Sequence, residues 1–303
     1  MSSASQSSIC LAPRAPLQMA PQVLIGCIDI AAVGARVLLS LQPPSGWAVT
    51  ETGVDVVGLL QPAGQPSLRP VLTSASSTSG AAVDQPSSSG SGSDSAPLVV
   101  VRSMAPPGSS TPAVSLVVLN AAVPEGDQAE VAAALADLIT TPSGSGSSSS
   151  SGTAPSIVVA AAMLLQQLAK PAPLYQHLLN GAKPLGGAAA AAQPLPTAGA
   201  AGATAAAAAT AGGLRVRDGQ LAALLHVLAV GGEAAACLVV PGTKPTASAP
   251  LDLPDAAPAC DTLGAVLSGV TGLSYSPDAC RAVTSSYKWF VPERTAGSDV
   301  MYT

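Results

Sequence analysis

The chain has 303 residues and a formal net charge of −5, with 12 lysines and arginines. Because these basic residues are few and scattered, they form no patch of the kind that binds nucleic acid or an anionic membrane surface. Long tracts of Ser, Gly, Ala and Pro cannot bury enough apolar area to offset the entropy of ordering them. The remainder suits one hydrophobic core, so we predict a single domain over residues 23–290.

The N-terminal residues and the cysteines bear on the location of the protein. Residues 1–22 are rich in Ser and Ala and lack a secretory apolar block, so we predict a disordered leader. An organelle transit peptide is the alternative, because no acidic residue precedes Asp29, although Arg14 is the leader's one basic residue. The five cysteines are odd in number and lack metal-ligand spacing, which indicates buried thiols in a reducing compartment. No stretch is apolar enough to predict a membrane helix.

The first elements in chain order are a strand and a helix in direct succession. Residues 23–30 form an apolar run suited to a strand buried on both faces, and residues 31–41 place their apolar side chains on one helical face. Such a pair is typical of an α/β sheet. Residues 47–60 predict one strand or a short hairpin. Two further strands are expected at residues 97–104 and 113–119, antiparallel to one another.

The clearest helix follows these strands. Asp127 is a good N-cap with Glu130 three residues later, as in a capping box, and the apolar residues of the following turns share one face. Residues 156–160 then predict a strand. Short helical segments are expected at residues 163–170 and 173–179.

The second half of the chain predicts a helix–strand unit and two more helices. Asp218 caps an amphipathic helix that a glycine pair ends, and residues 233–240 form the last apolar strand. Further helices are predicted at residues 260–272 and 277–287.

Three low-complexity insertions interrupt these elements. They lie near residues 61–96, 141–155 and 183–213, and we predict that all three are disordered, since the entropy of loop closure grows only slowly with length. Residues 291–303 are predicted to form a flexible tail. The fold class predicted from the whole order is a single three-layer α/β domain with a central mixed sheet, decorated by long Ser/Gly/Ala-rich loops.

Residues suited to catalysis occur only singly. The sequence contains no dinucleotide fingerprint, phosphate loop, HExxH or paired CxxC motif. His177 and His226 could each join a cysteine or a metal, but lone histidines on helix flanks are usually structural. Asp252 and Asp255 bracket a proline loop and suit a solvated surface. Asp29 ends the first strand, where clefts form in α/β sheets, or it caps the following helix. We predict no catalytic residue, no metal and no cofactor.

The C-terminus concentrates the aromatic residues. Four of the seven aromatics fall between Tyr287 and Tyr302, although folded chains usually place such residues in the core. Residues 296–299 are small and polar, which indicates flexibility. The ending Met301-Tyr302-Thr303 offers an apolar residue, a tyrosine, one further residue and a free carboxylate. This pattern suggests a ligand carried on the chain end, with a frayed terminus as the alternative.

With these elements in view, the chain resembles the family of proteasome assembly chaperone 1. Residues 23–41 look like that family's opening strand and helix, residues 218–240 like its helix–strand unit, and residues 251–253 with the following helix like its next segment. The ending Met301-Tyr302-Thr303 resembles the C-terminus of the family. These parts cover about half of the chain. The three insertions and residues 287–292 depart from the family pattern.

The resemblance implies a non-catalytic chaperone that assembles the α ring of the 20S proteasome in the cytoplasm and the nucleus. It implies a heterodimer with a related chain, proteasome assembly chaperone 2, and contact with α-ring subunits. Tyr302 would pack in a groove between adjacent ring subunits, and the carboxylate of Thr303 would pair with a lysine there. Met301 would add apolar contact.

Three other interpretations stay open. An enzyme of nucleoside-phosphorylase-like fold would need a closed polar pocket around Asp29. A proteasome activator or ATPase-associated adaptor would use the same tail on mature particles, although the missing phosphate loop excludes a motor ATPase. A mostly disordered protein without a defined partner disagrees with the capped amphipathic helices.

Overall fold

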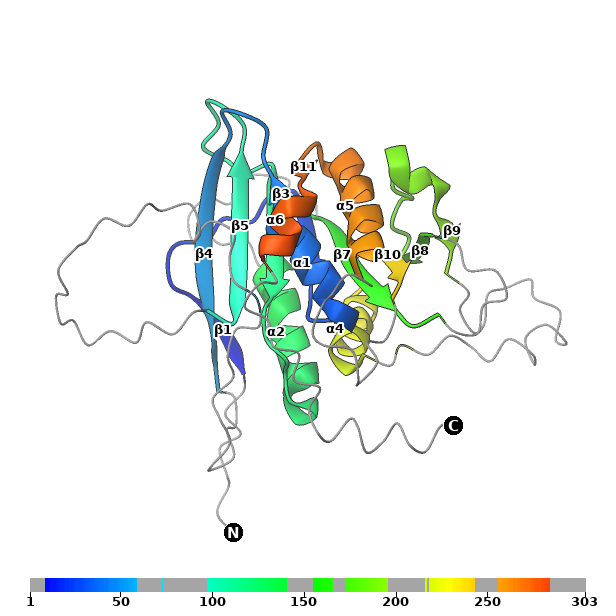
Figure 1. Cartoon of the computed structure of the whole chain (residues 1–303). Coiled ribbons are helices and arrows are strands. Elements are labelled where there is room, and N and C mark those ends of the chain that lie inside the picture. Colours follow the sequence, from blue (N-terminus) through cyan, green and yellow to red (C-terminus); the bar gives the residue numbers. More distant parts are fainter. Residues whose placement is uncertain are drawn as a thin grey trace, which may run out of the picture.

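The computed structural model describes residues 9–58, 72, 97–140, 155–165, 173–195, 216, 218–242 and 256–283. The strands of its large sheet are β1 (Cys10–Pro13), β2 (Gln22–Gly26), β4 (Ala48–Val57), β5 (Val99–Ala105), β6 (Val114–Leu119), β7 (Ser156–Met163), β8 (Tyr175–Leu179), β9 (Gln193–Pro194) and β10 (Ala235–Pro241). They form one mixed nine-stranded sheet in the order β1-β4-β5-β6-β2-β7-β10-β8-β9 (Figure 1).

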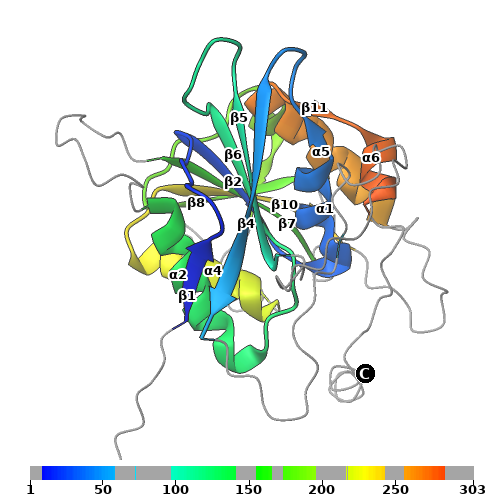
Figure 2. The ribbon, with the colours of Figure 1, turned by 90° about the vertical axis from the view of Figure 1, so that its left-hand side faces the viewer.

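Helices cover both faces of this sheet, which confirms the predicted three-layer α/β fold. The helices are α1 (Val33–Ser40), α2 (Gln128–Thr140), α4 (Gly219–Val230), α5 (Ala257–Thr271) and α6 (Pro277–Ala282). Shorter elements are the 3-10 turns η1 (Ile30–Ala32), η3 (Glu125–Asp127) and η4 (Gly187–Ala191), and the paired two-residue strands β3 (Leu41–Gln42) and β11 (Ser274–Tyr275). α2 packs on α4 on one face of the sheet, and α1 packs against α5 and α6 on the other (Figure 2).

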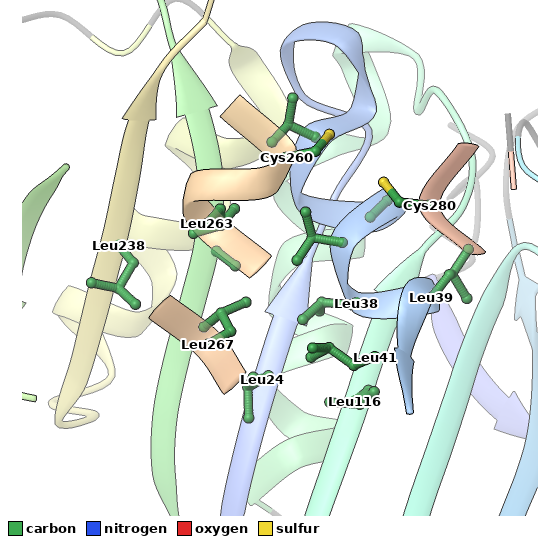
Figure 3. Packing of buried hydrophobic residues seen from close by; sticks show 14 of the residues in the cluster. Leu24, Leu38, Leu39, Leu41, Leu116, Leu238, Cys260, Leu263, Leu267 and Cys280 are labelled. Atoms are coloured by element: carbon green, nitrogen blue, oxygen red, sulfur yellow. The ribbon is translucent and has the colours of Figure 1, made fainter. Parts of the chain in front are cut away.

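The centre of the sheet is parallel and buried on both sides. β6, β2, β7 and β10 run in one direction, and β5 and β4 continue antiparallel from β6. On β2, Ile25 belongs to the apolar cluster under α2 and α4, whereas Leu24 belongs to the cluster under α1 and α5. Figure 3 shows Leu24 with Leu38 of α1 and Leu263 of α5. The continuous apolar run of β2 follows, because a strand covered on both faces has no solvent side.

The predicted helix–strand units are confirmed at their ends. Asp218 Oδ1 accepts a hydrogen bond from Leu221 N at 2.7 Å at the start of α4. Gly272, with a φ of 74°, ends α5 in the left-handed region. The segment predicted at residues 47–60 contains the single strand β4. α6 forms the first part of the helix predicted at residues 277–287, whose last residues lie outside the described ranges.

The capping box predicted for α2 is wrong. Asp127 lies in the turn η3, where its amide donates to the carbonyl oxygen of Pro124 at 2.9 Å. Glu130 Oε2 instead accepts a hydrogen bond from Ile9 N at 3.3 Å. The carboxylate therefore ties the N-terminal segment to α2. This contact joins residues 121 positions apart, so no local pattern predicts it.

The short helix predicted at residues 173–179 is wrong, because this segment contains the strand β8. Asn180, with a φ of 50°, follows the strand. Its Nδ2 donates to the carbonyl oxygens of Leu228 at 3.0 Å and Glu233 at 2.9 Å, which fixes the strand end beside the C-terminus of α4. Pairing with β10 prevails because a helix of this length has little stability of its own.

Parts of the segments predicted to be disordered are ordered. Within residues 1–22, β1 pairs with β4 and Leu17 is buried, so the prediction of a wholly disordered leader is wrong. Within residues 183–213, η4 packs against α5 and β9 pairs with β8, which corrects the prediction for the first part of that insertion. Residues 1–8 and 196–213 lie outside the described ranges, as do residues 166–170 of the helix expected after β7.

The insertion at residues 61–96 contains one described residue, Leu72. Its side chain is buried, and its backbone pairs with the side chain of Asn120. Leu72 N donates to Asn120 Oδ1 and Asn120 Nδ2 donates to Leu72 O, both at 2.7 Å. The prediction of disorder is therefore wrong at this point. The rest of that insertion and residues 141–154 lie outside the described ranges.

Gly34→Ala is expected to destabilise the fold. A Cβ at Gly34 of α1 would collide with the carbonyl oxygen of Ala160 on β7, which is backbone and cannot move aside. We expect the free energy of unfolding to fall by about 1–3 kcal/mol, measured by urea denaturation. Gly126→Ala is the control, because nothing lies within 4 Å of its Cβ position. Equal effects of the two substitutions would contradict the close contact of α1 with β7.

Candidate functional site

The predicted binding residues Met301, Tyr302 and Thr303 lie outside the described residues. The aromatic residues Tyr287, Trp289 and Phe290 lie outside them as well. Their role therefore stays a prediction. The last described residues belong to α6 and to Val283, whose side chain is fully buried. The chain thus continues toward its C-terminus from a point fixed on the body.

Asp29 occupies the turn between β2 and α1. Its side chain is 5% exposed, and its Oδ2 accepts hydrogen bonds from Gly34 N at 3.1 Å and from Ala162 N at 2.6 Å. Between these points, Ala31 and Ala32 have φ values of 56° and 50°, in the left-handed region that alanine rarely adopts. The carboxyl group therefore joins the turn to β7 and holds a strained backbone in place.

Burial raises the pKa of Asp29 well above its usual range, because desolvation outweighs the backbone hydrogen bonds that favour the charged form. Among the described residues, only backbone amides donate to this carboxyl group. The arrangement favours the capping role over acid–base chemistry, since the nucleoside-phosphorylase-like interpretation needs polar side chains around Asp29. Asp252 and Asp255 lie outside the described residues.

The two histidines do not complete a site with the buried cysteines. His226 is exposed on α4, and His177 on β8 is half-buried opposite Cys237 of β10. Burial raises the pKa of the Cys237 thiol to about 12, and it raises the pKa of Cys27 as well. Both cysteines are therefore protonated near neutral pH, and a thiol is a poor nucleophile. The described part of the chain holds no group of three potential metal ligands.

A polar cluster that the sequence patterns missed lies between α1, α5 and α6. Arg36 of α1 is 2% exposed, and its Nε and Nη1 make no hydrogen bond. Cys260 of α5 and Cys280 of α6 are buried in the same cluster, and Tyr275 of β11 packs against it. In the sequence, Arg36 is a single arginine within an apolar helix. The amphipathic pattern did not predict its burial, because an arginine on such a helix usually lies on the solvent-exposed face.

Comparisons with known proteins give structural likenesses only. No protein-family model matches the chain, and no curated protein matches it. Among solved structures, the chain is similar to PbaB of Pyrococcus furiosus, an archaeal proteasome activator, with 10% identity over 97% of each chain and a TM-score of 0.47. It is similar to a Thermoplasma acidophilum protein of unknown function, with 12% identity over 94% of this chain and 92% of that one and a TM-score of 0.49.

A further similar structure is that of Pyrococcus furiosus PbaA, an archaeal homolog of proteasome-assembly chaperone. It has 10% identity over 96% of this chain and 92% of that chain, with a TM-score of 0.43. Likenesses at this level assign neither a family nor a function. Among the described helices, none has the length and apolar character needed to cross a membrane.

Asp29→Asn is expected to change how stability depends on pH. Because the folded-state pKa of Asp29 is raised, the folded chain keeps a proton that the unfolded chain releases near pH 4. The stabilisation from this proton is complete below that pH and is lost as the pH rises through the folded-state pKa. Asn cannot ionise, so the stability of the wild type relative to Asp29→Asn should decline with rising pH in urea titrations. A difference that is constant with pH would contradict the raised pKa.

Proposed function

We propose that the chain is a non-catalytic chaperone that assembles the α ring of the 20S proteasome. In this proposal it forms a heterodimer with a related chain, proteasome assembly chaperone 2, and acts in the cytoplasm and the nucleus. The observation that carries the proposal is the ending Met301-Tyr302-Thr303 at the end of a chain whose earlier segments resemble the same family in the same order.

The arrangement of the resembling segments supports this proposal. Residues 23–41 contain α1 and most of β2, and residues 218–240 contain α4 and most of β10. The strands β2 and β10 lie on either side of β7 in the sheet. α5 follows at Ala257–Thr271 and packs against α1. The segments that carry the resemblance are therefore the centre of the body. The departures from the family are the three insertions between the elements and residues 287–292 near the C-terminus.

The hydrogen bonding of Asp29 also supports a role as a scaffold. Of the three acidic candidates that the sequence offered, Asp29 is the one among the described residues, and its carboxyl group accepts hydrogen bonds from backbone amides. A residue with this task stabilises the turn and is poorly placed to meet a substrate. The proposed contribution of the body is to present surfaces to a partner and to hold the start of the tail.

The proposed docking of the tail has a simple physical basis. The ring of Tyr302 can bury a large apolar area in a groove while its hydroxyl keeps a polar partner. The carboxylate of Thr303 would meet a lysine, and a charged pair gains strength when a neighbouring aromatic group excludes water. Residues of this kind act as binding hot spots, each contributing about 2 kcal/mol or more.

Tyr302→Ala is expected to weaken binding to α-ring subunits by about 2 kcal/mol, or roughly 30-fold in Kd. Deleting Met301, Tyr302 and Thr303 should have at least this effect. The measurement is affinity purification of the full chain with an N-terminal tag, followed by mass spectrometry and by titration against the captured ring subunits. Tyr287→Ala is the matched control, because it removes the same side chain from an earlier position.

Three outcomes would contradict the proposal. Equal loss of the partner chain and the ring subunits on deletion would contradict separate roles for the body and the tail. Equal effects of the Tyr302 and Tyr287 substitutions would contradict a specific C-terminal motif. Recovery of mature particles in place of half-built rings would favour the activator or adaptor interpretation over the chaperone.

A further inference from the structure

Two cysteines that no predicted function uses lie side by side in the structure. Cys260 of α5 is 1% exposed and Cys280 of α6 is 2% exposed. Their side chains point toward one another above Leu38 and Leu39 of α1 (Figure 3). The two thiols are close enough to share a hydrogen bond. Both cysteines are free thiols.

A buried positive charge accompanies this pair. Arg36 is 2% exposed, and its Nε and Nη1 are buried without a hydrogen-bond partner. A guanidinium keeps its charge when buried, so an uncompensated one is costly. Its charge acts on both Cys260 and Cys280, favouring the thiolate form of each. A thiolate at one of them would supply the counter-charge that Arg36 needs.

The surroundings favour Cys280 as that thiolate. The pKa of Cys280 is lowered, chiefly by the hydrogen bond from the Cys260 thiol, with burial acting in the opposite direction and the charge of Arg36 adding to the effect. The same contact raises the pKa of Cys260, and burial raises it further. Of the two sulfurs, Cys280 is therefore the one whose surroundings favour the thiolate, and Cys260 is the one that keeps its proton.

Two hydroxyl groups, those of Tyr275 and Ser40, also lie beside the sulfur of Cys280. The Tyr275 hydroxyl donates to Asp261 Oδ1 at 3.0 Å, and the Ser40 hydroxyl donates to the carbonyl oxygen of Val37 at 2.7 Å. Since each hydroxyl has one proton and that proton is already in use, Cys260 remains as the donor to the thiolate.

We propose that Cys260 and Cys280 form a redox-reactive dithiol that takes a hydroperoxide as its substrate, with Cys280 as the attacking sulfur and Cys260 as the resolving sulfur. Cys280 attacks one oxygen of hydrogen peroxide, the O–O bond breaks, hydroxide leaves, and Cys280 becomes a sulfenic acid. Cys260 then loses its proton and attacks the sulfenic sulfur. The S–O bond breaks, water leaves, and a disulfide joins α5 to α6. One peroxide is reduced to two waters as two thiols become one disulfide.

Access for the peroxide comes from the small size of α6. This helix has six residues, and the ion pair between Asp278 and Arg281 lies on its exposed side, where such pairs add little stability. Fluctuations of so short an element that admit a small peroxide while Cys280 stays beside Cys260 and Arg36 need much less free energy than global unfolding. Once the disulfide forms, α6 is held to α5 covalently. A cellular thiol pool would reverse the bond by thiol–disulfide exchange, as in redox-sensing proteins of reducing compartments.

The first experiment maps the disulfide in the full-length reduced chain carrying Cys10→Ser, which removes the exposed cysteine. After hydrogen peroxide treatment, free thiols are blocked with N-ethylmaleimide and the chain is cut before aspartates. Cuts at Asp255, Asp261 and Asp278 separate Cys260 from Cys280, so their bond appears as two linked peptides. We expect a link between Cys260 and Cys280. Cys27 and Cys237 should remain reduced, so N-ethylmaleimide should block both of them once the chain is denatured.

The second experiment separates the roles of the two sulfurs. In Cys260→Ser, peroxide should leave a sulfenic acid at Cys280 that dimedone traps. In Cys280→Ser, Cys260 should react more slowly than Cys280 does in Cys260→Ser, because burial still raises the pKa of Cys260 after the contact with Cys280 is gone. Near-ultraviolet circular dichroism and the urea midpoint check that each variant is folded. A sulfenic acid trapped equally well at Cys260 in Cys280→Ser would overturn the assignment of the attacking sulfur.

The third experiment tests the charge of Arg36. Arg36→Met should slow the peroxide reaction of Cys280 about threefold or more at neutral pH, since a rise of about half a unit in the pKa of a thiol lowers its thiolate population by up to that factor. Arg281→Met is the matched control, because it removes a positive charge from α6 itself at the surface, and it should change the rate less than twofold. An unchanged rate in a folded Arg36→Met chain, or no linked peptides in a folded, peroxide-treated wild type, would overturn the proposal.

Discussion

The structure depends on the contact of α1 with the sheet, where the backbones of helix and strands meet directly at Gly26 and Gly34. A Cβ on Gly26 would come within 2.8 Å of the carbonyl group of Gly34, and a Cβ on Gly34 would collide with Ala160. Asp29 completes the contact by accepting hydrogen bonds from the amides of Gly34 and Ala162. Because the helix begins this close to β2 and β7, its apolar side chains reach the sheet directly and one half of the core forms around it.

The close packing of α1 on the sheet also explains why polar residues of α1 are buried beneath α5 and α6. A helix enclosed on every side buries its polar residues together with its apolar ones, and each must find a partner. Ser40 donates to a carbonyl oxygen of its own helix. Two nitrogens of Arg36 have no hydrogen-bond partner, and its positive charge acts on the neighbouring thiols. Tight packing of the helix and the distinct state of Cys280 therefore have one cause.

Local patterns predicted the elements whose stability is local. The central strands, the amphipathic helices and the cap at Asp218 all follow from spacing and composition, and all are present. The pairing of β8 with β10, the bond from Ile9 to Glu130 and the burial of Arg36 could not be predicted, because each depends on residues distant in sequence. The proposed binding residues Met301, Tyr302 and Thr303 rest on the sequence alone.

Leu72 gives the long segment between β4 and β5 an unexpected division. Because the hydrogen bonds with Asn120 fix Leu72, they divide the segment into a shorter part before Leu72 and a longer part after it, and the ends of each part are fixed. The closure entropy of one part is then independent of the length of the other. An epitope tag or a fluorescent reporter spliced in ahead of Leu72 would therefore leave the register of β4 and β5 unchanged.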